Sequence, residues 1–154
     1  VAKTTSSRQE DQAVRDARAA EIAGGLGSLN VYRSFASRVH AVKRGLLRFL
    51  IQAKEEGKVV AAYGAAAKGN TLLNFCGVRE DMIAYAVDRN PAKAGRWLPG
   101  SRIPIDVPKR ILRERPDYVL ILPWNIKEEV MQQMSEVRVY GGRFIVAIPE
   151  LTIL

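Results

Sequence analysis

The sequence predicts an α/β fold: a Rossmann-like parallel sheet covered by helices and preceded by a helical N-terminal segment. Two observations lead to this fold class. After residue 57, apolar runs of five or six residues alternate with helical patterns, which is typical of parallel strands buried on both faces and joined by right-handed crossovers. The chain has 154 residues, 47% of them apolar and 26% charged, which is enough for one domain with a proper core.

Two helices are expected before the sheet. The segment from Gln9 to Ile22 reads as a polar helix that stops at the glycines beginning with Gly24. From Ser34, a candidate N-cap, apolar residues recur at steps of three and four up to Ala53. This spacing predicts a helix of about six turns with an apolar face that packs on the elements after it.

The expected organisation has a disordered terminus at 1–7, a helical linker segment at 8–56 and a Rossmann-like substrate-binding domain at 57–154. Within that domain, the apolar runs predict strands at 58–63, 82–87, 103–105, 118–122 and 143–148, and the helical patterns lie at 68–75, 108–114 and 126–134.

Composition excludes several classes of site and partner. No run approaches the roughly 20 apolar residues that cross a bilayer, and the first residues are polar, so we expect no membrane partner and a cytoplasmic location. One cysteine, Cys76, and one histidine, His40, cannot supply four thiolate or imidazole ligands, so we expect no metal site. His40 has no visible nucleophile or acid partner, and Cys76 reads as a small buried residue. We therefore name no catalytic residue.

The net charge of +8 predicts attraction to anions. Eight basic residues stand against two acids between Arg89 and Arg115, which we call the basic stretch. Prolines interrupt it and it contains no recognised nucleic-acid motif. We therefore expect no nucleic-acid partner, and a nucleotide or a phosphorylated metabolite fits the charge as well.

Ligands of open α/β sheets bind beyond the carboxyl ends of the strands, so the loops there hold the candidate substrate-binding residues. The first loop begins at Gly64 and has Ala66 where the dinucleotide pattern has its middle glycine. Small residues let the main chain approach a phosphate, which the positive end of the next helix favours; a tight turn without a ligand is the alternative. The candidates in this loop are Gly64, Ala65, Ala66, Lys68, Gly69, Asn70 and Thr71.

Two later loops add further candidates. Asp88 lies 24 residues after Gly64, where an acid meets ribose hydroxyls in dinucleotide sites, but an Asx-turn explains it equally well. Trp124 is placed to stack on a base or a sugar ring, while Asn125 with Glu128 also fits a capping box. The candidates outside the first loop are Asp88, Arg89, Asn90, Lys93, Arg102, Trp124 and Asn125.

The segment from Tyr63 to Asn74, with the sequence YGAAAKGNTLLN, resembles the C-terminal domain of the S-adenosylmethionine-dependent sugar C-methyltransferases. Those enzymes act on nucleotide-linked deoxysugars. The resemblance covers residues 33–149. Its other blocks are Val87–Lys93, Leu98–Gly100, Ile103–Ile105, Arg115–Tyr118, Leu122–Asn125, Gly141–Phe144 and Ile148–Pro149.

The resemblance implies that this chain is one part of a methyltransferase. In that family a zinc-binding N-terminal domain and a central domain for S-adenosylmethionine come first, and the catalytic histidine and tyrosines lie mainly upstream. A histidine is common where this chain has Arg102, although an arginine there still suits a phosphate. Class I methyltransferases usually carry an acid two positions before their first glycine, where this chain has Ala62. We therefore expect S-adenosylmethionine and zinc to bind outside this chain.

These observations predict the nucleotide-sugar-binding domain of a C-methyltransferase that is inactive on its own. Its partners would be a nucleoside-diphosphate sugar, held in one crevice by the Gly64 loop and the basic stretch, and an upstream methyltransferase domain. One alternative is a free-standing Rossmann-like domain that binds a dinucleotide or coenzyme A in an oxidoreductase or regulator. Another is an interaction module that docks through the long helix.

Overall fold

The structure is a computed structural model that describes residues 11–154, so the expected disordered terminus at 1–7 lies outside the described residues. The chain divides into two compact units, Val1–Val39 and His40–Leu154. The first holds helix α1 (Gln12–Ala23) and the beginning of helix α2 (Leu29–Glu55). The boundary between the two units therefore falls inside α2.

Helix α2 begins before the residue that we expected as its N-cap. The Ser34 N-cap is wrong, because Ser34 lies inside α2 and its hydroxyl donates to the Val31 carbonyl at 2.9 Å. A serine inside a helix bonds back to the preceding turn in this way. The capping hydrogen bond comes instead from Ser28, whose hydroxyl oxygen accepts the Asn30 amide at 3.3 Å.

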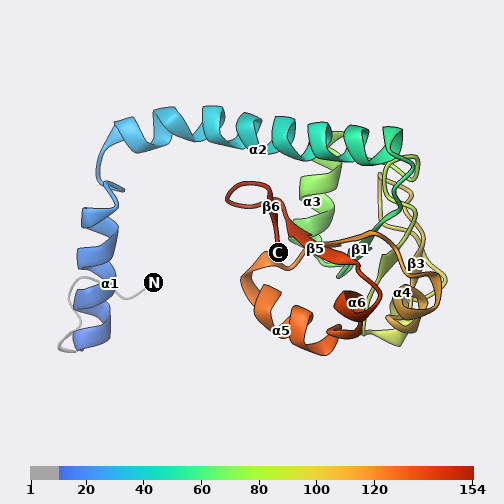
Figure 1. The fold of residues 1–154 in the computed structure, drawn as a ribbon. Helices are drawn as coiled ribbons and strands as arrows, with labels where there is room; N and C mark the ends of the chain where they lie inside the picture. Colours follow the sequence, from blue (N-terminus) through green and yellow to red (C-terminus); the bar gives the residue numbers. More distant parts are fainter. Residues whose placement is uncertain (1–10) are drawn as a thin grey trace. The chain divides into compact units, whose positions relative to one another are not determined.

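The second unit is built on a six-stranded sheet, in the order β3-β2-β1-β4-β5-β6 (Figure 1). All neighbouring pairs are parallel except the pair of β5 with β6. The expected α/β fold is therefore confirmed, and its sheet is mostly parallel. The antiparallel strand β6 was not expected, because both of its residues are exposed and one of them is polar. The strands are β1 (Val60–Tyr63), β2 (Ala86–Val87), β3 (Ile105–Asp106), β4 (Tyr118–Ile121), β5 (Arg143–Val146) and β6 (Thr152–Ile153).

Helices cover both faces of this sheet. In Figure 1, α3 lies on one side of the strands and α5 and α6 lie on the other. The expected helices at 68–75 and 108–114 are confirmed, and the one at 126–134 is divided between a short 3-10 helix and α5. The connecting helices are α3 (Ala67–Cys76), η1 (Pro91–Lys93), α4 (Lys109–Glu114), η2 (Trp124–Ile126), α5 (Lys127–Gln133) and α6 (Glu136–Val139).

Alternate residues of β1, β2, β4 and β5 enter two separate cores. Val60 and Ala62 of β1 face the core that includes α2 and α3, while Ala61 and Tyr63 face the core of α4, α5 and α6. Leu46 is fully buried in the first core, which stabilises the fold by about 1.5–3 kcal/mol for a side chain of this size. Burial of this face explains the apolar periodicity of α2 and leaves the ends of the strands to carry function.

Candidate functional site at the carboxyl ends of β1 and β4

The strand order creates a switch point between β1 and β4, because the chain proceeds from β1 toward β3 on one side and from β4 toward β6 on the other. The loops after these two strands touch. Gly64 has a φ of +93°, and a Cβ on it would lie 2.6 Å from Cδ of Pro123. Gly69 is equally close to the residue that follows β4, since a Cβ added to Gly69 would lie 2.6 Å from Cβ of Leu122. Both positions therefore require glycine.

Lys68 joins the two loops. Its ammonium donates a hydrogen bond to Oδ1 of Asn125 and lies 4.7 Å from the centre of the Trp124 ring, a cation–π distance. The expected capping box at Asn125 is wrong, because Ile126 is the N-cap of α5 and no side chain caps that helix. Asn125 holds Lys68 instead. A base could stack on this face of Trp124 only if Lys68 moved aside.

The N-terminus of α3 adds main-chain donors beside Lys68. Ala66 is the N-cap and makes no side-chain hydrogen bond. The Asn70 amide donates to the Ala66 carbonyl at 3.0 Å, so the three amides before Asn70 have no acceptor within the helix. These N–H groups and the positive end of the helix dipole favour an anion.

Asp88 fastens the loop after β2 to the loop after β1. One carboxylate oxygen accepts the Asn90 amide at 2.9 Å, which confirms the Asx-turn, and the other accepts the Ala65 amide at 2.7 Å. The Lys93 ammonium donates to that second oxygen and to the Ala65 carbonyl, both at 2.9 Å. Burial alone would raise the pKa of Asp88, but the hydrogen bonds from Asn90, Lys93 and Ala65 outweigh it and lower the pKa. Asp88 and Lys93 therefore neutralise each other.

A second network borders the site on the other face of the sheet. The Tyr63 hydroxyl donates to Oε1 of Gln133 at 3.3 Å, and the Gln133 amide donates to Glu129 at 2.8 Å. Arg89 lies 3.6 Å from the same Glu129 oxygen. Burial raises the pKa of Tyr63, so its hydroxyl keeps its proton. Sequence reasoning missed Tyr63, Glu129 and Gln133. Glu129 and Gln133 look like any exposed pair on a helix, and their spacing of four residues was the available signal.

Arg102 lies at the opposite end of the sheet. The parallel register aligns Ala62 with Ala86 and Ala86 with Ile105, so Asp88 follows its strand whereas Arg102 precedes β3. The structure therefore brings Arg89 and Lys93 to the Gly64 loop but does not bring Arg102 there. The basic stretch does not line one crevice.

The side chains of two other candidates already form hydrogen bonds within their own segments. The Thr71 hydroxyl donates to the Ala67 carbonyl at 3.1 Å inside α3, and the Asn90 side chain accepts the Ala92 amide at 3.0 Å. Oδ1 of Asn70 is buried and has no hydrogen-bond partner among the described residues. Of the candidates, Lys68 is the cation that remains free of a carboxylate at the switch point.

The two residues that we expected to be structural differ in burial, because Cys76 is buried and His40 is exposed. Cys76 is 3% exposed, as expected for a small buried residue, and burial raises the pKa of its thiol. The His40 ring lies 5.9 Å from the ring of Phe75.

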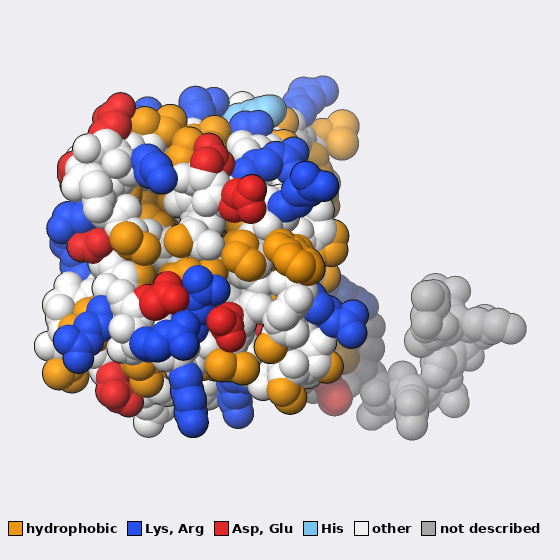
Figure 2. Space-filling model, turned by 90° about the vertical axis from the view of Figure 1, so that its right-hand side faces the viewer, with side chains coloured by type: hydrophobic (Ala, Val, Ile, Leu, Met, Phe, Trp, Pro, Cys, Tyr) orange, Lys and Arg blue, Asp and Glu red, His pale blue; other side chains and the backbone are white. Residues whose placement is uncertain are grey.

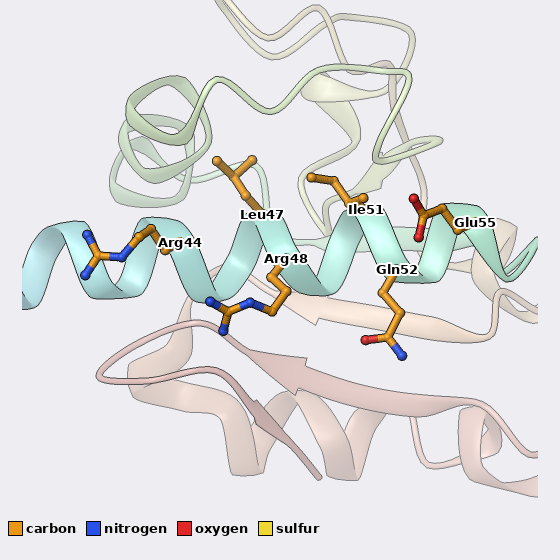
Figure 3. A pocket seen from close by; sticks show the side chains of 6 residues that line it. All are labelled: Arg44, Leu47, Arg48, Ile51, Gln52 and Glu55. Carbon is orange, nitrogen blue, oxygen red and sulfur yellow. The ribbon is translucent and has the colours of Figure 1, made fainter.

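A hollow of about 580 Å³ lies away from the switch point, along α2 (Figure 3). All six lining residues belong to that helix, with Leu47 and Ile51 on one side and Arg48 and Gln52 on the other. It is an open helix surface and offers no converging groups for a small ligand.

Charges of both signs are mixed on the face of the molecule in Figure 2, where no unbroken basic patch forms. Among residues 11–154 no group of three or more His, Cys, Asp or Glu side chains is arranged to hold a metal ion. In the same residues, no helix is long and apolar enough to cross a membrane.

Comparisons with known proteins decide the family. The family model described as the C-methyltransferase C-terminal domain matches residues 1–149. The chain belongs to this family. It is 42% identical over 141 residues, 90% of its length, to the C-methyltransferase NovU of Streptomyces niveus. The resemblance seen in the sequence is thereby confirmed, and its first block is the loop and helix that meet β4 at the switch point.

The C-methyltransferase C-terminal domain is one part of a longer protein in this relative. The chain spans about a third of the length of NovU, since the match covers 33% of it.

Proposed function

We propose that this chain is the nucleotide-sugar-binding domain of an S-adenosylmethionine-dependent C-methyltransferase that acts on a nucleoside-diphosphate deoxysugar in the cytoplasm. One observation carries the proposal. At the switch point, Lys68 stands beside the uncapped N-terminus of α3 and reaches Asn125 of the loop after β4. Family membership supports the reaction class, because the relative NovU is named a C-methyltransferase.

The proposed ligand has the charge that this site favours. A diphosphate would accept hydrogen bonds from the main-chain amides that begin α3, and the Lys68 ammonium would add a charge-assisted contact. Arg89 is the second cation near the loop, since its contact with Glu129 is long and exposed. Asp88 and Lys93 would hold the loop in shape instead of touching the phosphates.

The residues of this chain do not fit a site for the methyl donor. Ala62 lies in β1 where class I methyltransferases usually carry an acid, and it is fully buried. The Asp88 carboxylate already accepts three hydrogen bonds and its side chain is only 13% exposed, so little of it is left to accept from ribose hydroxyls. S-adenosylmethionine supplies an electrophilic methyl group, and we propose that it binds in the upstream part of the protein, which would also hold the zinc that the family resemblance implies.

The three hydrogen bonds already accepted by the Asp88 carboxylate also weigh against the alternative of a free-standing domain for a dinucleotide or coenzyme A. A dinucleotide site of this fold uses the acid after the second strand for the ribose. The same titration that tests the proposal covers this alternative, with NAD as the probe.

Calorimetric titration with uridine and thymidine diphosphate glucose tests the proposal. We expect micromolar to millimolar affinity, on the order of −8 to −4 kcal/mol, that weakens as salt rises. Lys68→Ala should weaken binding about tenfold, because it removes one contact to a charged group. Lys58→Ala is the matched control: this lysine pairs with Asp117 near the start of β4 and should leave affinity unchanged. Equal affinity of Lys68→Ala and the parent would refute the phosphate site, and tighter binding of NAD would favour the alternative.

A further inference from the structure

A second cavity, of about 440 Å³, lies at the amino-terminal end of the sheet and plays no part in the proposed function. It is lined by Glu80, Trp97 and Arg102. Its volume is within the range of small-molecule sites. The lining combines an aromatic ring, a cation and an anion.

The three lining side chains are free to meet a ligand. Trp97 is 63% exposed although it is the largest kind of apolar side chain. Glu80 and Arg102 line one cavity without pairing: among the described residues, neither forms an ion pair or a side-chain hydrogen bond. Opposite charges that stay apart in one cavity leave both available to a third group.

The turn that carries Arg102 is held firmly in place. The Asn74 side chain donates to the Pro99 carbonyl at 2.9 Å, and the Arg79 guanidinium donates to the Gly100 carbonyl. Arg102 itself has a φ of +60°, a left-handed conformation that costs a non-glycine residue about 1 kcal/mol or more. Such strain persists where the surrounding structure fixes it, and it is found preferentially at binding sites.

One more group in this turn is unsatisfied. Ser101 is fully buried, and its hydroxyl has no hydrogen-bond partner in the described structure. A buried hydroxyl without a partner is costly, so each case calls for an explanation. The neighbour of Arg102 thus adds a second sign that this turn is not optimised for stability alone.

We propose that this cavity binds the base of a nucleoside. The Trp97 indole would stack on the flat heterocycle, the Glu80 carboxylate would accept its ring N–H, and the Arg102 guanidinium would donate to the adjacent carbonyl oxygen. A base such as uracil offers these two groups side by side on one edge. The site lies at the other end of the strands from Lys68, so it is independent of the proposed diphosphate site.

Single-tryptophan variants separate the two sites, because the chain has only two tryptophans and one belongs to each. In Trp124→Phe the emission reports Trp97, and in Trp97→Phe it reports Trp124. We titrate both variants with uridine, which has no phosphate. The expected result is quenching in Trp124→Phe at millimolar uridine and none in Trp97→Phe. No quenching of Trp97, or equal quenching in both variants, overturns the proposal. The Lys68→Ala titration with nucleoside-diphosphate glucose tests the proposed diphosphate site alone, so the two proposals can fail separately.

Two matched controls test the recognition itself. The nucleoside 3-methyluridine lacks the ring N–H, so it should bind Trp124→Phe at least fivefold more weakly than uridine does. Adding Glu80→Gln to Trp124→Phe should weaken the binding of uridine by at least the same factor. Equal affinity in either comparison overturns the assigned edge. Arg102→Gly removes the guanidinium and suits the left-handed backbone, so the protein should fold as well as the parent and lose binding about tenfold. Arg115→Gly makes the same change at another left-handed arginine, with a φ of +50°, and should leave uridine binding intact. Equal losses in both variants overturn the role of Arg102.

Discussion

Replacing Asp88 with asparagine separates a structural clamp from a ribose contact. The carboxylate accepts three hydrogen bonds, from the amides of Ala65 and Asn90 and from the Lys93 ammonium. An asparagine amide keeps one acceptor oxygen and presents an NH₂ group where the other was. Whichever way it is oriented, a donor then faces a donor.

The size of the effect follows from burial. A hydrogen bond to a charged group contributes about 1.5–3 kcal/mol, but the Lys93 side chain is 37% exposed, so the ion pair adds less than the two amides. We expect Asp88→Asn to reduce the free energy of unfolding by about 2–3 kcal/mol. For a chain of this size that corresponds to a melting temperature lowered by about 5–10 °C.

Circular-dichroism melts at pH 7 give the measurement, with Asp117→Asn as the comparison. Asp117 accepts the Val59 amide at 2.8 Å and pairs with Lys58 at 3.0 Å, but its side chain is 36% exposed, so its loss should be smaller, about 1 kcal/mol. If Asp88→Asn melts within about 1 °C of the parent, the clamp is refuted. If it also loses affinity for nucleotide sugars, Asp88 touches the ribose instead.

Three further changes test other parts of the structure. Partial burial would raise the pKa of Asp88 and Asp117, but hydrogen bonds outweigh it and lower both pKa values. The two carboxylates therefore stabilise the fold fully above their unfolded pKa of about 4, and this stabilisation is lost as pH falls through their folded pKa values. Melts from pH 7 to pH 3 should show the loss of stability, and Asp88→Asn should make it shallower. Gly69→Ala should cost about 1–3 kcal/mol in urea unfolding because its Cβ would overlap Leu122, whereas Gly45→Ala, whose Cβ would make an ordinary 3.8 Å contact, should gain about 0.5–1 kcal/mol; equal effects would contradict the packing argument. Burial raises the pKa of the Cys76 thiol, so iodoacetamide should label the folded protein far more slowly than the urea-unfolded chain, and equal rates in mass spectrometry would show that the thiol is accessible.

The sequence was sufficient for the elements whose signal is local. The alternation of apolar runs and helical patterns predicted the parallel strands, because each strand is buried on both faces and therefore almost entirely apolar. Strand β6 carries no such signal, because both of its residues are exposed. The start of α2 was misplaced because Ser28 and Ser34 have the same capping chemistry, and only the hydrogen bonds tell which one is outside the helix.

The pairing of side chains within the site was not predictable from spacing. Asn125 and Glu128 have the spacing of a capping box, but the close approach of Gly64 to Pro123 brings Lys68 within reach of Asn125, and a hydrogen bond to a charged donor is stronger than one to a main-chain amide. The Asp88 signal was ambiguous for a similar reason. Its Asx-turn is local and readable, whereas its bond to the Ala65 amide depends on the pairing of β1 with β2.

The basic stretch shows most clearly what strand register adds to composition. Its charges are close in sequence, yet the chain passes from the carboxyl end of β2 to the amino end of β3 between Arg89 and Arg102. A peptide in a strand advances about 3.3 Å per residue, so a few residues suffice to carry a charge from one end of this sheet to the other. Arg110 is then used on α4, where it contacts Asp106 and Glu114 and lies over the Tyr85 ring at 4.1 Å. A net charge can therefore predict an anionic ligand, but only the register determines which of the basic residues can share it.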